Sequence, residues 1–249
     1  ARWIAPARVA PRPRARVKQG MLRELRPASL VELGDGRASK TRIIRDASWD
    51  AGNARCYVTI DVMAAFLDET AGRVRAEYPG LVVNPIVADF TDRISLIGPL
   101  PHPAVIAFLG STIGNFTPIE AQRLLGRIRA AMAPGDRFLL GADLRKNLTR
   151  LLAAYNDAAG ITAQFNLNML RVLNREVGAD FNETLFKHRA TYDGNLHRIE
   201  MHLVSDVTQT VRISGAGKFD FAAGEPVRTE ISCKYDRPSI EHILAAAGL

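Results

Sequence analysis

One glycine turn and two aspartates, each following a predicted β-strand, are the residues best placed to do chemistry. The stretch LVELGDGRASKT (30–41) carries an apolar strand into the turn Gly34-Asp35-Gly36, and a polar run follows that can begin a helix. Such a junction brings the backbone close to a ligand and points helix N–H groups at it. Asp61 ends the next predicted strand, and Asp89 ends the third with Phe90 beside it. These positions predict a nucleotide-like cofactor whose ribose hydroxyls bond to Asp61 and whose adenine lies near Asp89 and Phe90.

Two cofactors are compatible with this turn. Nicotinamide dinucleotides favour G-x-G-x-x-G, but the third glycine position holds Ser39 here. S-adenosylmethionine (SAM) has no phosphate, so the turn need not cradle one, and the acidic Glu32 is tolerable near its cationic sulfonium. A strand-end aspartate is more often a helix cap than a ligand. Because suitable residues follow three consecutive strands, methyl transfer is favoured and hydride transfer is second.

The elements that position these residues alternate between strand and helix from residue 28. The apolar run AVIAFLGS is typical of a strand buried in a parallel sheet. Five β-α units in series predict an α/β fold with a doubly wound sheet and ligands at the carboxyl ends of its strands. The expected strands are 28–33, 54–62, 81–90, 104–111 and 134–143, and the expected helices are 39–47, 63–78 and 118–132.

A different pattern begins after Asp143 and predicts a smaller inserted α+β unit. Its helices are expected at 147–158 and 161–178, and the last helix of the chain is expected at 239–248, after this unit. Helical spacing predicts that one apolar face of the second helix belongs to the core. That face comprises Ile161, Phe165, Met169, Val172 and Leu173. Strand-like segments are expected at 184–193, 198–213 and 226–234.

The composition excludes several classes of function. The net charge is +7, but residues 1–18 carry six basic side chains and no acid, so a solvated tail is favoured over a nucleic-acid-binding surface. No apolar run is long enough to cross a bilayer. Cys56 and Cys233 alone cannot form a disulfide framework, which fits the reducing cytoplasm. The five histidines lack ligand spacing, so no metal site is expected.

At FLGSTIGN (108–115) the chain resembles a known family, the histidine-specific N-alpha-methyltransferases of ergothioneine biosynthesis. The resemblance spans about residues 28–249, and its most specific parts are the block 151–181 and the segment TEIS. The other matching blocks are VELGDGRASKTR, YVTIDVMAAFL, AEYPGL, VADF, LLGADLRKN, RIEMHL and FAAGEPVRTEISCKY.

The resemblance implies a SAM-dependent enzyme that methylates the α-amino group of L-histidine three times, giving hercynine. It implies that Asn115 and Tyr155 hold the α-amino group during catalysis. Glu230 and Ser232 would bind the imidazole, with Ile231 between them and Met201 nearby. Independently, residues two apart on a strand share a face, so a carboxylate and a hydroxyl could grip the two edges of a ring. SAM contacts are implied at Gly34, Lys40, Asp61, Asp89 and Phe90.

The family architecture implies a Rossmann-like class I methyltransferase sheet with an inserted α+β domain that closes over the amino acid. We expect a SAM-binding domain at 21–145, a substrate-binding domain at 146–234 and a return to the first domain at 235–249, with 1–20 as a tail outside the fold. Family members have a longer N-terminal region and two further strands, so the sequence is expected to be a shortened form. It is expected to act as a cytoplasmic monomer on free L-histidine, without nucleic acid or membrane partners.

Alternatives remain for both residues and function. Asn115 could be the N-cap of the 118–132 helix, Tyr155 a packing residue and Glu230 a solvated strand residue. The protein could instead methylate a tryptophan-type amine, although such an enzyme should lack an acid for imidazole. The third possibility is an inactive, truncated SAM-binding domain.

Overall fold

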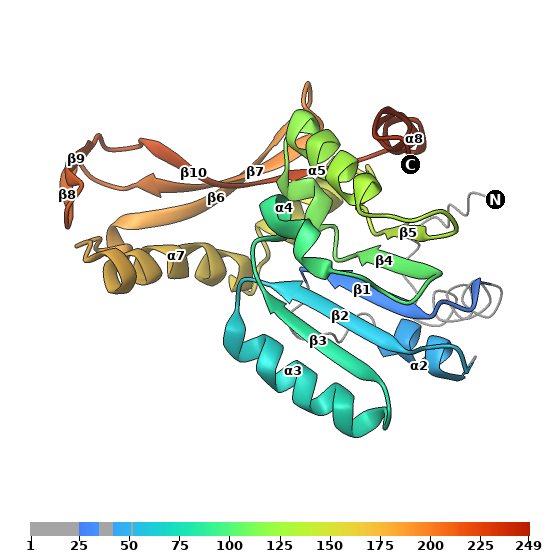
Figure 1. Cartoon of the computed structure of the whole chain (residues 1–249). Coiled ribbons are helices and arrows are strands. Elements are labelled where there is room, and N and C mark those ends of the chain that lie inside the picture. Colours follow the sequence, from blue (N-terminus) through green and yellow to red (C-terminus); the bar gives the residue numbers. More distant parts are fainter. Residues whose placement is uncertain (1–24, 35–41, 51) are drawn as a thin grey trace. The chain divides into compact units, whose positions relative to one another are not determined.

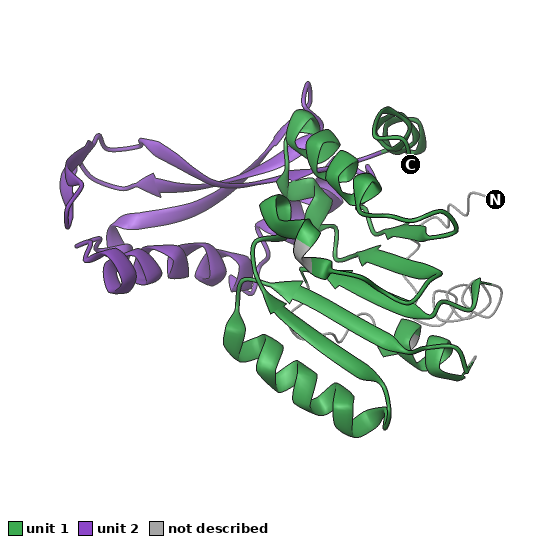
Figure 2. Cartoon of the chain, in the orientation of Figure 1, with its two compact units in different colours: residues 1–143, 236–249 green, residues 144–235 purple. Residues whose placement is uncertain are grey.

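The computed structural model describes residues 25–34, 42–50 and 52–249. The chain divides into two compact units, with residues 1–143 and 236–249 in unit 1 and residues 144–235 in unit 2 (Figure 2). Each unit has its own sheet.

Unit 1 contains a five-stranded sheet in the order β3-β2-β1-β4-β5, and all of its pairings are parallel (Figure 1). β1 and β4 are buried along their whole length, β4 as its continuous apolar sequence predicts and β1 although it contains Ser29 and Glu32. The strand order reverses between β1 and β4, which makes the carboxyl ends of these two strands the expected ligand crevice. The predicted α/β fold is confirmed. The strands are β1 (Ser29–Leu33), β2 (Cys56–Asp61), β3 (Val82–Val87), β4 (Ala104–Phe108) and β5 (Arg137–Leu140).

Helices cover this sheet through apolar stripes. One core cluster joins Ile44 of α2 and Val74 of α3 to Leu30, Tyr57 and Val83 of the strands. The last helix of the chain, α8, packs against α5. The helical elements of unit 1 are α2 (Arg42–Asp50), α3 (Ala64–Glu77), α4 (Phe90–Arg93), η1 (Ile94–Ile97), η2 (Thr112–Asn115), α5 (Pro118–Ala130) and α8 (Arg237–Ala246).

Unit 2 contains an antiparallel sheet in the order β10-β7-β6 and a two-stranded hairpin of β8 and β9. Two helices pack on the same face of the three-stranded sheet, against Ile199 and Leu203 of β7. The predicted strand 198–213 is wrong as one element, because a turn divides it into β7 and β8. The elements are α6 (Leu148–Tyr155), α7 (Ile161–Val177), η3 (Glu183–Leu185), β6 (Phe186–Asp193), β7 (Arg198–Ser205), β8 (Gln209–Ile213), β9 (Gly217–Phe221) and β10 (Pro226–Cys233).

The predicted core face of α7 is wrong at its N-terminal end. Ile161 and Phe165 are 69% and 67% exposed, whereas Asn166 and Leu170 are buried. The Asn166 amide donates to the His202 carbonyl at 3.1 Å and lies 2.9 Å from His188 Nδ1. The buried face of α7 therefore includes a polar residue, Asn166, whose amide is hydrogen-bonded. A search for apolar residues at helical spacing does not detect such a position.

Candidate functional site

Gly34, the residue directly after β1, lies close to Phe90. Gly34 donates its N–H to the Ile60 carbonyl at 3.0 Å and has a φ of +70°. A Cβ atom at this position would lie 3.0 Å from Cε1 of Phe90. The Phe90 ring in turn lies edge-on to Phe108, with centroids 5.5 Å apart. The structure thus brings Gly34 and Phe90, two of the predicted cofactor residues, next to one another, and a side chain at position 34 would require the Phe90 ring to shift.

The two predicted aspartates lie at the same edge of the sheet. Asp61 ends β2, which pairs in parallel with β3, and Asp89 follows β3 by two residues. Asp61 Oδ1 accepts the Met63 N–H at 3.0 Å. Both carboxylates stand at the carboxyl ends of neighbouring strands, where an adenosyl ligand would need acceptors.

The helix-cap interpretation of Asp89 is correct, and it leaves room for a ligand. Asp89 Oδ1 accepts hydrogen bonds from the Thr91 N–H at 2.8 Å and the Thr91 hydroxyl at 2.7 Å, as the N-cap of α4. These bonds lower the pKa of Asp89, so the carboxylate stays charged. Both bonds use the same oxygen, and the side chain is exposed. One carboxylate can therefore cap the helix and accept from a bound ligand.

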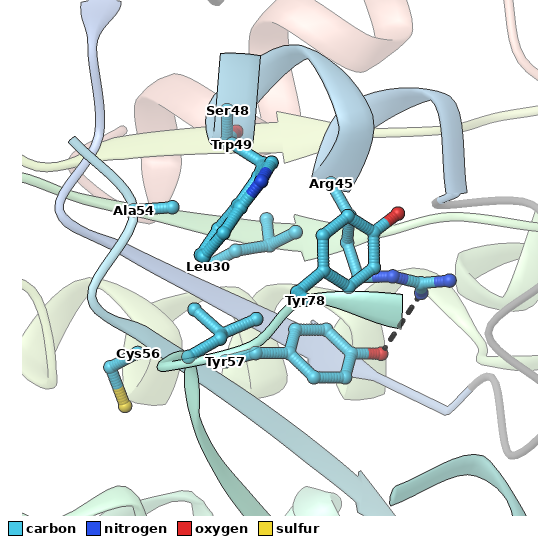
Figure 3. Close-up of a pocket in the computed structure, with 9 residues that line it drawn as sticks. Leu30, Arg45, Ser48, Trp49, Ala54, Cys56, Tyr57 and Tyr78 are labelled. Carbon is cyan, nitrogen blue, oxygen red and sulfur yellow. Dashed lines mark hydrogen bonds between the residues drawn. The ribbon is translucent and has the colours of Figure 1, made fainter. Parts of the chain in front are cut away.

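Glu32 is neutralised inside the protein. It is 1% exposed and accepts a hydrogen bond from Tyr57 Oη at 2.5 Å, while Arg45 Nη1 lies 4.0 Å from its carboxylate. Figure 3 shows Arg45 and Tyr57 turned toward one another, with a hydrogen bond of 3.5 Å. Burial and the neighbouring Glu32 raise the pKa of Tyr57, which therefore remains a donor. This network fixes the end of β1 just before Gly34.

The small apolar pocket in Figure 3 is not at this edge of the sheet. Its lining includes Leu30, Ala54 and Cys56, which stand at the beginnings of β1 and β2. Gly34 and Asp61 stand at the opposite ends of the same strands. The pocket therefore belongs to the packing under α2 rather than to a cofactor site.

Asn115 is not the cap of the following helix. The N-cap of α5 is Thr117, which forms a capping box with Glu120. Asn115 ends the short helix η2 after β4, and its side chain is exposed. Among the described residues no hydrogen bond occupies its amide. Its donor and acceptor atoms are therefore available to a ligand near the carboxyl end of β4.

The four described residues of the predicted cofactor site are compatible with SAM. Gly34, Asp61, Asp89 and Phe90 all lie at the carboxyl edge of the β1-β2-β3 region, and a Cβ atom on Gly34 would require the Phe90 ring to shift. Lys40, the fifth predicted contact, lies outside the described residues.

Asp61→Ala should weaken SAM binding strongly. Two ribose hydroxyls would lose a charged acceptor, and a hydrogen bond to a charged group is worth roughly 1.5–3 kcal/mol, or about ten- to 150-fold in affinity. Isothermal titration calorimetry measures the effect. Asp68→Ala, on the exposed face of α3, is the matched control and should bind SAM like the parent protein. A folded Asp61→Ala protein with the parent's affinity would remove Asp61 from the site.

In unit 2, the predicted substrate residues gather around an unpredicted lysine. Tyr155, the last residue of α6, donates its hydroxyl hydrogen to Ser232 Oγ at 2.9 Å. The buried Lys234 donates from Nζ to Tyr155 Oη at 2.7 Å and to Ser232 Oγ at 2.8 Å. The sequence contains one indication of this cluster. Lys234 follows Glu230 and Ser232 at intervals of two residues, so in a strand all three side chains share one face.

A β-bulge places Glu230 on that face. The register of β10 against β7 pairs Arg228 with His202 and then Glu230 with Met201, so Thr229 is the extra residue. The Thr229 hydroxyl donates to the Met201 carbonyl at 3.0 Å. Without the bulge Glu230 would face Glu200, on the other side of the sheet. Bulges commonly redirect side chains in this way next to active sites.

Glu230 is half-buried rather than a fully solvated strand residue. Burial raises its pKa, and the nearby charge of Lys234 opposes that shift. Met201, directly opposite, is buried in the core cluster with Leu151 and Ile199. Ile231 pairs with Glu200 on the other face, so its side chain points away from Glu230. The roles of Met201 and Ile231 as substrate contacts remain predictions.

Tyr155 is positioned by residues that the sequence did not single out. The Asn156 side chain donates to the Ala190 carbonyl and accepts the Ala190 N–H, both at 2.9 Å. His188 Nε2 lies 2.7 Å from the Tyr155 carbonyl, and His188 Nδ1 lies 2.9 Å from the Asn166 amide nitrogen. In this arrangement His188 Nε2 donates to the Tyr155 carbonyl and Nδ1 accepts from the Asn166 amide. The end of α6 is therefore fixed to β6.

The described part of the chain was also searched for a metal site, for reactive cysteines and for helices that could cross a membrane. It contains no group of three or more His, Cys, Asp or Glu side chains that could hold a metal ion. Cys56 and Cys233 are buried, and neither forms a disulfide. None of the described helices combines the length and apolarity needed to cross a membrane.

Comparison with known proteins identifies the family. The family of histidine-specific, SAM-dependent methyltransferases matches residues 15–249. A histidine N-alpha-methyltransferase from Mycolicibacterium smegmatis is 43% identical over 89% of this chain and 69% of its own length. Another from Mycobacterium tuberculosis is 44% identical over 90% of this chain and 70% of its own length. Ergothioneine biosynthesis protein 1 from Neurospora crassa is 29% identical over 89% of this chain but only 25% of its own length. The resemblance found in the sequence is confirmed, and the chain belongs to the family of SAM-dependent, histidine-specific methyltransferases.

Proposed function

We propose that this protein transfers methyl groups from SAM to the α-amino nitrogen of L-histidine, up to the trimethylated product hercynine, as a step of ergothioneine biosynthesis. The observation that carries the proposal is the face of β10, where the half-buried carboxylate of Glu230 stands two residues from the Ser232 hydroxyl and its partner Tyr155. A carboxylate and hydroxyls can satisfy both nitrogens of an imidazole in either tautomer.

The two units would bind different molecules. Unit 1 would hold SAM through Gly34, Asp61, Asp89 and Phe90, and unit 2 would recognise histidine. When bound, SAM supplies an activated methyl group whose C–S bond breaks as the new C–N bond forms. The chain need only hold the amine with its lone pair oriented for attack, because orientation alone can supply much of the rate of such a transfer.

Asn115 is the residue of unit 1 best suited to orient the amine. Its side-chain oxygen can accept an N–H of the amine, and no neighbouring described residue competes for that oxygen. Free histidine is mostly an ammonium ion at neutral pH, so the amine must lose a proton to solvent before it can attack. The neutral primary and secondary amines each have an N–H to donate to this oxygen, whereas the tertiary amine that receives the third methyl group has none.

The second candidate substrate, a tryptophan-type amine, is disfavoured by Glu230. An indole offers one N–H donor and a large apolar face, whereas Glu230 is a half-buried acid. A carboxylate in that position would be left largely unpaired by an indole. Cytoplasmic location and a monomeric state remain predictions.

Mass spectrometry of the protein incubated with SAM and L-histidine tests the proposed function. Mono-, di- and trimethylhistidine should appear in sequence, and fragmentation should place every methyl group on the α-nitrogen. A competition with L-tryptophan should favour histidine. Faster methylation of tryptophan would support the second candidate. SAM binding by calorimetry without any methylated product would instead indicate an inactive SAM-binding domain.

A further inference from the structure

We propose that His188, kept in one tautomer by Asn166, is a positioning residue that holds Tyr155 in place for the recognition of L-histidine. The proposal rests on the proposed function, because Tyr155 is one of the residues predicted to bind the substrate. His188 acts through Tyr155 and does not itself touch the substrate. All of the contacts that support this role lie within unit 2.

Tyr155 occupies the least secure position of a short helix. It is the last of the eight residues of α6, and the carbonyls in the last turn of a helix have no hydrogen-bond donor within that helix. His188 Nε2, on β6, donates to the Tyr155 carbonyl at 2.7 Å and supplies the missing donor. Helix ends without such partners fray. The His188 hydrogen bond therefore fixes the backbone that carries the Tyr155 side chain.

Tyr155 also connects the two outer strands of the sheet of unit 2. The strand order is β10-β7-β6, so the outer strands lie about 10 Å apart. The Tyr155 carbonyl is bound from His188 on β6, whereas its hydroxyl lies 2.9 Å from Ser232 Oγ on β10. Because a tyrosine ring is rigid and its side chain has only two torsions, a shift of the backbone at β6 moves the hydroxyl at β10. His188 thus controls a contact on the face that carries Glu230.

Asn166 determines which nitrogen of His188 donates. The Asn166 side chain is 3% exposed, and its amide nitrogen lies 3.1 Å from the His202 carbonyl oxygen, which can only accept a hydrogen bond. The second hydrogen of the same amide nitrogen is available to His188 Nδ1, 2.9 Å away. Rotating the amide would bring its oxygen against the His202 carbonyl oxygen. The ring hydrogen of His188 therefore belongs on Nε2, the nitrogen beside the Tyr155 carbonyl.

A second attachment separates the effect of His188 from folding. The Asn156 side chain donates to the Ala190 carbonyl and accepts the Ala190 N–H, both at 2.9 Å. This pair of hydrogen bonds keeps the end of α6 beside β6 when His188 is replaced. Loss of the His188 hydrogen bond should therefore alter the orientation of Tyr155 rather than unfold unit 2.

Two substitutions test the two hydrogen bonds of His188 separately. His188→Gln places an amide nitrogen near the position of Nε2 and keeps a donor for Tyr155. His188→Asn keeps a polar atom near Nδ1 for Asn166 but cannot reach Tyr155. His188→Asn should lower kcat/KM for L-histidine about tenfold, as expected for one lost hydrogen bond, whereas His188→Gln should stay within about threefold of the parent protein. SAM affinity, measured by calorimetry, should match the parent value in both variants.

His242→Asn, the same substitution on the exposed face of α8, is the matched control and should behave like the parent protein. If His188 were merely structural, His188→Asn and His188→Gln would lower kcat/KM equally or would leave it unchanged per folded molecule. Either result would overturn the proposal. Neither result touches the proposed function, which fails only if the parent protein makes no methylhistidine. In that case the same comparison is made on L-histidine affinity, by calorimetry with S-adenosylhomocysteine in place of SAM.

A double-mutant cycle with Tyr155→Phe tests whether His188 acts through the Tyr155 hydroxyl. Adding His188→Asn to Tyr155→Phe should lower kcat/KM, or L-histidine affinity, by less than about threefold, because the contact that His188 controls is already gone. Losses that multiply to the full product of the two single variants would contradict this role. If the His188 variants do not fold, nitrogen-15 NMR of the assigned parent protein decides the matter. The His188 ring should carry its hydrogen on Nε2, and a hydrogen on Nδ1 alone would overturn the proposal.

Discussion

Glu230→Ala should cut kcat/KM for histidine by roughly ten- to 150-fold, the equivalent of about 1.5–3 kcal/mol for a lost hydrogen bond to a charged group, while SAM affinity stays at the parent value. The imidazole would lose its only predicted acidic partner, and sites built to pair polar groups discriminate strongly when that pairing fails. Adding Met201→Val, directly opposite on β7, should raise activity on tryptophan relative to histidine. Competition assays that give kcat/KM for both amino acids measure both effects.

Glu200→Ala is the matched control for this prediction. Glu200 stands on the neighbouring strand but on the opposite face, where it forms ion pairs with Arg198 and, at 3.2 Å, with Arg228. Its loss should lower the free energy of unfolding without altering the preference for histidine. Because Met201 is buried, Met201→Val should itself lower stability by roughly 1–3 kcal/mol, so melting curves must accompany the assays. If Glu230→Ala kept the parent's preference for histidine, Glu230 would not be the imidazole anchor.

Gly34→Ala should weaken SAM binding by about five- to 150-fold. The new Cβ would lie 3.0 Å from Cε1 of Phe90, and the ring must move to relieve that contact. Loss of the stacking surface that Phe90 offers to adenine would cost roughly 1–3 kcal/mol, by analogy with aromatic–base stacking elsewhere. Calorimetric titration with SAM measures the change.

Gly52→Ala separates this steric effect from backbone strain. Gly52 has a φ of +74°, close to the +70° of Gly34, but a Cβ there would meet nothing within 4 Å. Both variants should lose about 1–2 kcal/mol of stability, because an L-residue is strained in this left-handed conformation. Only Gly34→Ala should also lose SAM affinity. Equal SAM affinity in the two variants would show that the contact between Gly34 and Phe90 does not shape the cofactor site.

The sequence by itself determined the parallel sheet and the positions in it of the described residues that are predicted to bind the cofactor. Apolar runs with glycine or aspartate at their ends specify β-α units, and parallel strands necessarily bring their carboxyl ends to one edge. Gly34, Asp61 and Asp89 therefore follow directly from local pattern. The same reasoning allowed Asn115 to be a helix cap, and only the capping box of Thr117 and Glu120 excluded that role.

The tertiary structure alone decided the face of β10 that carries the predicted substrate residues, and the buried side of α7. Strand periodicity showed that Glu230 and Ser232 share a face, but the bulge at Thr229 decided which face, because one extra residue reverses the alternation against the partner strand. Lys234 donates a hydrogen bond to Tyr155, which is 79 positions away in sequence and is followed by Asn156, whose side chain holds the end of α6 to β6. Asn166 rather than Phe165 is buried on α7, because the Asn166 amide forms hydrogen bonds with His188 of β6 and His202 of β7. Local sequence patterns record propensity and apolar spacing, whereas pairing register and polar partners arise only when distant segments meet.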